Sequence, residues 1–282
     1  MNHPALTAGG VAVITGGASG IGLAVAQKLS LLGMKVCIAD RDQRQLDQAL
    51  ATLGEDSSAE CVDVSAMSEV EGLRDRVFAR YGSVALLMNN AGTGGGGGAW
   101  QRYDGWQKVL GVNLWGVIHG LQCFVEPMLA QNSPGAIVNT GSKQGITNPP
   151  GDAAYNLSKA GVRSVTESLA HELRNTEGCQ LSAHLLVPGF TYTGLIKRHI
   201  PEKPDAAWLP EQVADELVAR MASGDFYILC PDNDVTVAMD YSRLQWNTDD
   251  LANNRPALSR WHPDYADAFA EFMAKSSVGD RT

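Results

Sequence analysis

The chain has 282 residues, of which 44% are hydrophobic, and it carries a net charge of −9. This size suits one large α/β domain, and an acidic chain without a dense Lys/Arg block is a poor partner for nucleic acid or an anionic membrane. No basic segment followed by an apolar one opens the chain, and no uncharged apolar stretch approaches the ~20 residues that cross a bilayer, so we expect neither a secretory signal nor a membrane span.

The five cysteines are widely spaced and form no CxxC pair or Cys/His cluster. This pattern is typical of reduced thiols in a cytoplasmic protein, and it predicts no metal site.

Seven short apolar runs alternate with longer amphipathic segments. The runs are rich in Val, Ile, Leu and Ala, as strands buried on both faces of a parallel sheet are. The predicted strands are residues 11–15, 35–40, 59–64, 84–89, 136–140, 181–187 and 226–230. The predicted helices between them are residues 21–32, 44–53, 68–81, 106–131 and 153–174. The alternation predicts a Rossmann-type, doubly wound parallel sheet of about seven strands with helices on both faces.

The pattern changes after Cys230, where a turn precedes two further predicted helices, residues 235–251 and 263–275. Some 50 residues are close to the lower limit for independent folding, so we expect one domain over residues 1–282 with a C-terminal helical extension at 232–282. Its large aromatic residues either close the substrate pocket or join a subunit interface, and we favour the interface; they are Tyr241, Trp246 and Trp261.

The first predicted strand leads directly into Gly16-Gly17-Ala18-Ser19-Gly20-Ile21-Gly22 and then a helix. Glycines at such a turn let the backbone approach a diphosphate, whose charge is stabilised by the free N–H groups at the helix N-terminus. No Gly-Lys-Ser/Thr follows, which argues against a nucleoside triphosphatase.

Two acidic residues lie at the ends of the second and third predicted strands. Asp40 ends the second strand, where a carboxylate accepts hydrogen bonds from ribose hydroxyls and repels a 2′-phosphate, so NAD is favoured over NADP. Arg41 leaves the alternative open, because its guanidinium can stack on adenine or receive a phosphate. Asp63 and Val64 end the third strand, where Asp63 is placed to hold the adenine amino group.

Tyr155 and Lys159 begin the predicted helix 153–174, with Asp152 as its N-cap. Positions four apart share a helix face, so the phenol and the ammonium line one cleft. We expect the cation to lower the tyrosine pKa and make Tyr155 a general acid/base. Further motifs accompany the pair: Asn89-Asn90-Ala91-Gly92, Asn113 within a long helix, Ser142 at a strand end, and Pro188-Gly189 with Thr191 and Thr193.

From residue 10 to about 231, these motifs and their order resemble the single-domain branch of the short-chain dehydrogenase/reductase family, of about 250 residues. The resemblance implies an oxidoreductase that transfers hydride between NAD(H) and a secondary alcohol or ketone. It also implies a homodimer or homotetramer, with subunit contacts through helices 106–131 and 153–174.

The resemblance further assigns roles to single residues. Tyr155 exchanges the substrate proton, Ser142 binds the substrate oxygen, Lys159 binds the nicotinamide ribose and Asn113 anchors a water that links Lys159 to solvent. Thr193 holds the carboxamide. The expected cofactor-binding residues are Gly16, Ser19, Gly20, Ile21, Gly22, Asp40, Arg41, Asp63, Val64, Asn90, Ala91, Gly92, Tyr155, Lys159, Pro188, Gly189, Thr191 and Thr193.

Residues 190–209 are the expected substrate lid, and their aromatic and aliphatic side chains suit a hydrophobic or aromatic substrate. The glycine run 94–98 is either a mobile surface loop or a place where substrate comes close. We expect Lys143 to face solvent or, less favoured, an acidic substrate group. Two rival functions remain open: an NAD(H)-binding regulatory protein without catalysis, and non-redox chemistry on the same fold.

Overall fold

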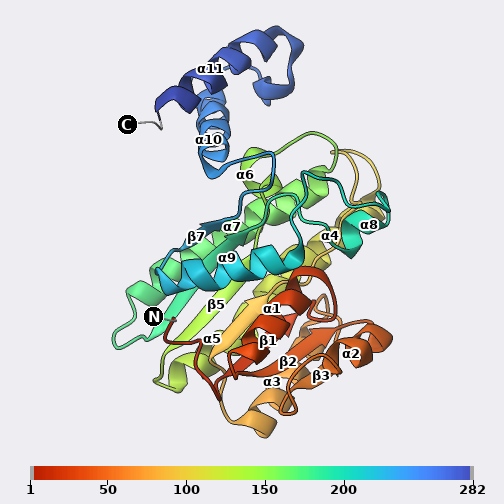
Figure 1. Cartoon of the computed structure of the whole chain (residues 1–282), viewed down its shortest axis with the longest axis vertical. Helices are drawn as coiled ribbons and strands as arrows, with labels where there is room; N and C mark the ends of the chain where they lie inside the picture. The colour runs from red at the N-terminus through yellow and green to blue at the C-terminus, as the bar shows by residue number, and fades with distance from the viewer. Residues whose placement is uncertain (1–2, 280–282) are drawn as a thin grey trace.

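The computed structural model describes residues 3–279 and contains one sheet of seven parallel strands in the order β3-β2-β1-β4-β5-β6-β7 (Figure 1). The strands are β1 Val11–Thr15, β2 Lys35–Asp40, β3 Ser58–Cys61, β4 Leu86–Asn89, β5 Gly135–Thr140, β6 Leu181–Val187 and β7 Tyr227–Leu229. The direction of winding reverses between β1 and β4, which opens a crevice beyond their carboxyl ends. The predicted fold class is confirmed.

Helices cover both faces of the sheet. One buried cluster joins the sheet to α1 Gly20–Leu31, α2 Gln43–Leu50 and α9 Pro210–Ala222. The cluster on the other face joins it to α3 Met67–Tyr81, α5 Gly116–Ala130 and α7 Ala153–Arg174. The sequence interpretation had assigned no element to residues 210–222.

The long helix predicted at residues 106–131 begins earlier and is interrupted. Helix α4, Tyr103–Leu110, runs into a π-helical turn, η1 Gly111–Trp115, before α5 begins at Gly116. By length and composition the combined helix Tyr103–Ala130 passes as a membrane span, but Phe124 and Met128 are fully buried in the core beneath it. We therefore describe it as a core helix of this domain.

The third strand is shorter than expected. It ends at Cys61, so Asp63 and Val64 lie in the connection that follows it. The Asp63 carboxylate folds this connection by accepting hydrogen bonds from the backbone N–H and the hydroxyl of Ser65 at 2.9 and 2.7 Å.

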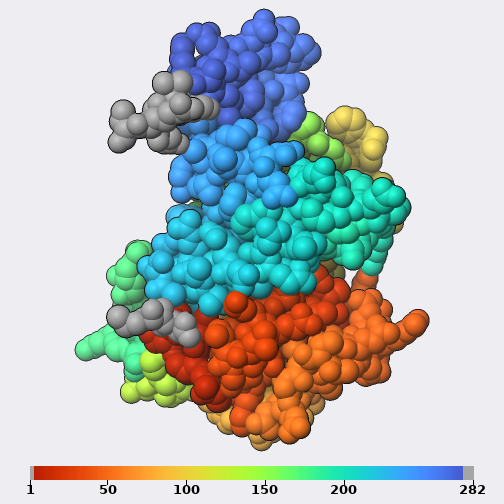
Figure 2. Space-filling model, viewed as in Figure 1, coloured from red at the N-terminus to blue at the C-terminus, as the bar shows by residue number. Residues whose placement is uncertain are grey.

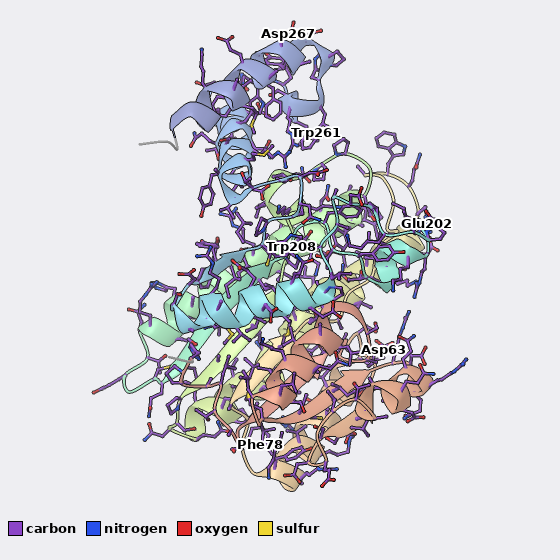
Figure 3. All side chains as sticks on the ribbon, viewed as in Figure 1. Asp63, Phe78, Glu202, Trp208, Trp261 and Asp267 are labelled. Carbon is purple, nitrogen blue, oxygen red and sulfur yellow. The ribbon has the colours of Figure 1, made fainter. Side chains whose placement is uncertain are left out.

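The C-terminal extension consists of α10 Val237–Ala252, the short 3₁₀ turns η2 Ser259–Trp261 and η3 Pro263–Tyr265, and α11 Ala266–Gly279. It projects from one end of the body, by which we mean the sheet and the helices that cover it (Figures 1 and 2). Trp246 is its centre: the rings of Phe269 and Phe272 each lie 5.3 Å away, and the indole N–H donates to Ser259 Oγ at 2.8 Å. Trp246 is 4% exposed, so its ring packs the extension itself, contrary to the expectation that it closes the pocket or joins an interface. Trp261 also lies on the extension, away from Asp63 (Figure 3).

Candidate active site

A cleft of about 880 Å³ lies beyond the carboxyl ends of the strands. It is lined by all but two of the residues predicted from the sequence: Gly16, Ser19, Gly20, Ile21, Asp40, Arg41, Asp63, Val64, Asn90, Ala91, Gly92, Ser142, Tyr155, Lys159, Pro188, Gly189, Thr191 and Thr193. The two that do not line it are Gly22 and Asn113. The fold therefore brings motifs from across the chain into one site.

The glycine turn is shaped by close backbone packing. Gly16 has φ +63°, and a Cβ on Gly22 would lie 2.2 Å from the carbonyl oxygen of Gly16. The absence of a side chain at Gly22 thus allows the backbone of the glycine turn to pack closely against the start of α1. Ser19 makes no side-chain hydrogen bond to the start of α1, whose first N–H groups have no partners within the helix and face the cleft.

Asn90 joins the glycine turn to the strands beside it. Its amide donates to the carbonyls of Thr15 and Gly16 at 3.1 and 3.2 Å, and its Oδ1 accepts from Thr140 Oγ1 at 3.3 Å. The side chain of Asn90 therefore has a structural role in addition to the expected place beside the cofactor.

The far end of the cleft is acidic. Asp40 Oδ1 accepts from the backbone N–H of Arg41 at 2.8 Å, and Oδ2 accepts from that of Ala18 at 3.4 Å. The hydrogen bonds from Ser65 hold the pKa of Asp63 below its usual value, with a smaller contribution from the charge of Arg41. A glycine turn at a helix N-terminus, followed by a carboxylate at the next strand end, is the donor and acceptor set that a dinucleotide requires, so these residues fit such a cofactor.

Tyr155, Ser142 and Lys159 meet at the other end. The first turn of α7 carries Tyr155, and Lys159 lies one turn further along, with its ammonium 5.8 Å from the centre of the tyrosine ring. Lys159 is 4% exposed and donates to the carbonyl of Thr140 at 2.8 Å.

Burial is the main cause of the pKa shifts of Tyr155 and Lys159. It raises the pKa of Tyr155, a shift that the hydrogen bond with Ser142 opposes and Asp152 reinforces. Burial also lowers the pKa of Lys159 to about 8. Among the protein's own groups the pKa of Tyr155 therefore moves in the direction opposite to the one expected from the Tyr-Lys pairing, because desolvation is the largest cause of the shift.

Asn113 lies in the π-helical turn, fully buried. Its Oδ1 accepts from Thr93 N at 2.7 Å, and its Nδ2 donates to Thr93 O at 2.9 Å and Ser158 Oγ at 3.1 Å. Its side chain thus holds the segment after β4 against α7. The π-turn itself is a feature that often marks functional sites and that the sequence pattern did not reveal.

Asp152 contributes more than the predicted N-cap. Its Oδ1 accepts from Tyr155 N at 3.2 Å, while Oδ2 accepts from Gly95 N at 2.9 Å and Gly96 N at 3.3 Å. A Cβ on Gly96 would lie 2.3 Å from Ala154 Cβ. At Gly96 the run is therefore packed against the start of α7, whereas Gly95 and Gly97 have the positive φ values that favour glycine.

The expected lid divides into two sets of side chains. Phe190, Leu195 and Ile196 line the cleft, the last two from the short helix α8 Gly194–Lys197. Tyr192 is 8% exposed and Trp208 packs against the core, so these two rings serve the protein interior.

Lys143 differs from the expectation. Lys143 lines the cleft but is largely shielded from solvent, because its ammonium group pairs with Asp232 and Asp240. Asp232 also lines the cleft, and it is the one residue of the described extension that does.

The family model described as short chain dehydrogenase matches residues 10–204. The chain is 34% identical to 3beta-hydroxysteroid dehydrogenase 2 of Eggerthella lenta over 198 residues, 68% of this chain and 75% of that protein. A crystal structure of a short-chain dehydrogenase/reductase from Burkholderia phymatum in complex with NAD matches with a TM-score of 0.79 and 35% identity, over 88% of this chain and 96% of that one. The structure of actinorhodin polyketide ketoreductase with NADPH matches with a TM-score of 0.69 and 29% identity, over 77% and 91% of the two chains.

Proposed function

Because the chain belongs to the short-chain dehydrogenase/reductase family of oxidoreductases, we propose that it transfers hydride between NAD(H) and a secondary alcohol or ketone. The observation that carries this proposal is the convergence of Ser142, Tyr155 and Lys159 at one end of a cleft whose other end is lined by Asp40 and the glycine turn.

The bound nicotinamide supplies the hydride chemistry, and the protein's residues handle the proton and the substrate oxygen. In ketone reduction, the Tyr155 hydroxyl donates its proton to the carbonyl oxygen. In alcohol oxidation, the Tyr155 phenolate accepts the proton from the hydroxyl group. Ser142, which hydrogen-bonds Tyr155, stabilises the oxygen as its charge changes.

Lys159 has two roles in this proposal. Its ammonium binds the nicotinamide ribose, and its positive charge favours the phenolate form of Tyr155. The carbonyl of Thr140, 2.8 Å from Nζ, fixes where that charge lies. Asn113 contributes by holding the backbone around this group in place.

We propose NAD over NADP. The Asp40 carboxylate at the end of β2 favours ribose hydroxyls and repels a 2′-phosphate. Arg41 also lines the cleft, and a relative with NADPH belongs to the same family, so NADP is the alternative.

For the substrate we propose a hydrophobic or aromatic molecule. Phe190, Leu195 and Ile196 give the lid side of the cleft an apolar surface beside Ser142 and Tyr155. A relative is named as a steroid dehydrogenase, which is consistent with a large apolar substrate.

We further propose a cytoplasmic homodimer or homotetramer. All five cysteines are unpaired, as in a reducing compartment. Trp115 and Leu157 are 53% and 49% exposed on the helices expected to form the subunit contact. Light scattering after size exclusion tests this assembly, and a monomer at micromolar concentration would contradict it.

The test of the function is reduced-nicotinamide absorbance while secondary alcohols are offered with NAD and then NADP. Wild type should reduce NAD, and Tyr155→Phe should lose turnover while it still binds NADH. A protein that binds NADH tightly yet transfers no hydride to any substrate would favour the regulatory alternative. Turnover that survives in Tyr155→Phe would remove Tyr155 from the mechanism.

A further inference from the structure

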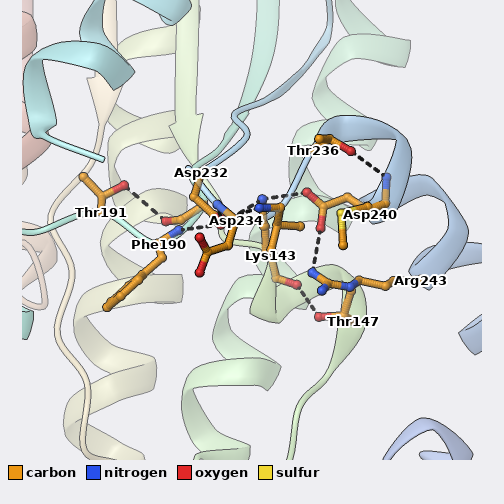
Figure 4. A network of polar contacts seen from close by, with 12 residues as sticks. Lys143, Thr147, Phe190, Thr191, Asp232, Asp234, Thr236, Asp240 and Arg243 are labelled. Carbon is orange, nitrogen blue, oxygen red and sulfur yellow. Dashed lines mark hydrogen bonds and ion pairs between the residues drawn. The ribbon is translucent and has the colours of Figure 1, made fainter. Parts of the chain in front are cut away.

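Lys143 directly follows Ser142, and carboxylates of the C-terminal extension enclose its ammonium group (Figure 4). Nζ lies 2.6 Å from Asp240 Oδ2 and 3.3 Å from Asp232 Oδ2. The side chains are 14%, 1% and 6% exposed, and Arg243 adds a second cation 3.5 Å from Asp240 Oδ1. Two carboxylates thus neutralise the Lys143 charge within the protein, and Arg260 adds a further positive charge that interacts with Asp240 and Arg243.

The Asp232 carboxylate also holds the start of the lid. Its Oδ2 accepts from the backbone N–H of Phe190 at 3.3 Å, and its Oδ1 accepts from Val235 N at 2.8 Å. A Cβ on Gly189 would lie 2.9 Å from Asp232 Oδ2 and 3.0 Å from Lys143 Nζ. A Cβ there would also lie 3.0 Å from the backbone carbonyl of Pro231, so a side chain at this position would crowd the ion cluster and the turn beside it.

The extension holds the segment after Ser142 at a second point. Lys143 begins the short helix α6 Gln144–Thr147, and its carbonyl accepts from Thr147 Oγ1 at 2.9 Å. Asn247 of α10 donates from Nδ2 to the carbonyl of Thr147 at 2.8 Å. Both ends of α6 are thus fastened to α10, which packs against it.

We propose that Lys143 is a positioning residue through which the C-terminal extension fixes Ser142 and Phe190 relative to Tyr155. Buried ion pairs constrain geometry, because a displaced charge loses its partner without gaining water. The extension contributes only Asp232 to the cleft lining within the described residues, so it acts on the reaction through this cluster. The inference rests on the proposed function for the role of Ser142.

The test compares Lys143→Met with Lys143→Arg, which keeps the charge, and with Lys28→Met, which breaks an exposed ion pair with Asp215 on the body. Asp240→Asn removes one negative charge and leaves the size of the side chain unchanged. For each variant we would measure kcat and KM, the NADH dissociation constant by fluorescence, and hydrogen–deuterium exchange of residues 141–147 and 188–192.

In Lys143→Met we expect exchange to rise in both segments and kcat to fall by up to about a hundredfold, the cost of a misplacement of about 1 Å, while NADH affinity stays within about twofold. Asp240→Asn should raise exchange and lower kcat in the same way. Lys143→Arg and Lys28→Met should both remain close to wild type.

Three results would overturn the inference: unchanged exchange in Lys143→Met, loss of NADH affinity equal to the loss of kcat, or a Lys143→Arg variant as impaired as Lys143→Met. If wild type shows no hydride transfer, the proposed function fails on that result alone, and exchange in the two segments still decides whether Lys143 positions them.

Discussion

Asp152 accepts a 2.9 Å hydrogen bond from the backbone N–H of Gly95, which joins the glycine run after β4 to the helix that carries Tyr155. The other oxygen of the same carboxylate caps that helix at Tyr155 N. The Asp152 side chain therefore helps to fix the position of Tyr155 at the start of α7 and the backbone of the glycine run beside it.

We expect Asp152→Ala to lower the free energy of unfolding by about 1–2 kcal/mol, since it removes a helix cap and leaves two loop N–H groups without their acceptor. KM for the alcohol should rise with it, because the loop borders the cleft. Chemical denaturation and steady-state kinetics check both quantities, with Asp152→Asn as an isosteric comparison of intermediate effect. Equal stability of Asp152→Ala and wild type would show that the carboxylate is dispensable.

Gly22→Ala should impair cofactor binding even though Gly22 does not line the cleft. The added Cβ would lie 2.2 Å from the Gly16 carbonyl oxygen, so the glycine turn must shift. We expect the NADH dissociation constant to rise at least about tenfold, which corresponds to losing about 1.4 kcal/mol of binding. Gly98→Ala is the control, because its Cβ would meet nothing closer than Gln101 Oε1 at 3.9 Å. Equal NADH affinities of the two variants would contradict this account of the turn.

Asp40→Ala should shift cofactor preference towards NADP. The substitution removes the charge that repels a 2′-phosphate and leaves Arg41 beside the cleft to receive one. The ratio of kcat/KM for NADP to that for NAD should rise at least about tenfold. Asp47→Ala, on the outward side of α2, serves as the control for a change in net charge. A preference that stays the same in Asp40→Ala would mean that Asp40 does not face the ribose.

Lys159→Met should stabilise the protein while abolishing turnover. Burial lowers the pKa of Lys159 from 10.5 to about 8, so the folded state disfavours the charged lysine by roughly 3 kcal/mol. This penalty is complete below pH 8 and disappears as the pH rises from about 8 to 10.5, where the folded and unfolded states both become neutral. After the loss of the hydrogen bond to Thr140 O, we expect a net gain of about 1–3 kcal/mol at pH 7.

Thermal unfolding at pH 7 and pH 10 checks this prediction. The melting temperature of Lys159→Met should exceed that of wild type at pH 7, and the difference should shrink towards pH 10. A variant that melts lower than wild type at both values would show that the lysine stabilises the fold.

The sequence predicted the fold and nearly all of the cleft because both depend on local patterns. Strand and helix periodicity fixed the winding, and parallel strands place their carboxyl ends at one edge, so Asp40, Asn90 and Ser142 had to converge. The π-turn at Asn113 escaped detection, because one extra residue in a helical turn hardly changes hydrophobic spacing. Helix α9 carries buried Val213, Leu217 and Met221 at helical spacing, so it was detectable in principle.

Polar contacts between residues far apart in the chain could not be predicted from the sequence. Lys143 and Asp232 are 89 positions apart, and no periodicity relates them. The direction of the Tyr155 pKa shift was wrong for a related reason: helical spacing predicts which groups are neighbours, but desolvation depends on the packing of the whole site.

The ion cluster around Lys143 also bears on how this chain diversified. The counter-charges of Lys143 both come from the last fifty residues, and without Lys143 the tail's two carboxylates keep only Arg243 as a paired cation. Losing either half leaves buried charge with fewer partners, which is costly, so we expect relatives to carry the lysine and the tail together. A tail grafted onto a relative that lacks it would therefore need a lysine at the position that follows the counterpart of Ser142.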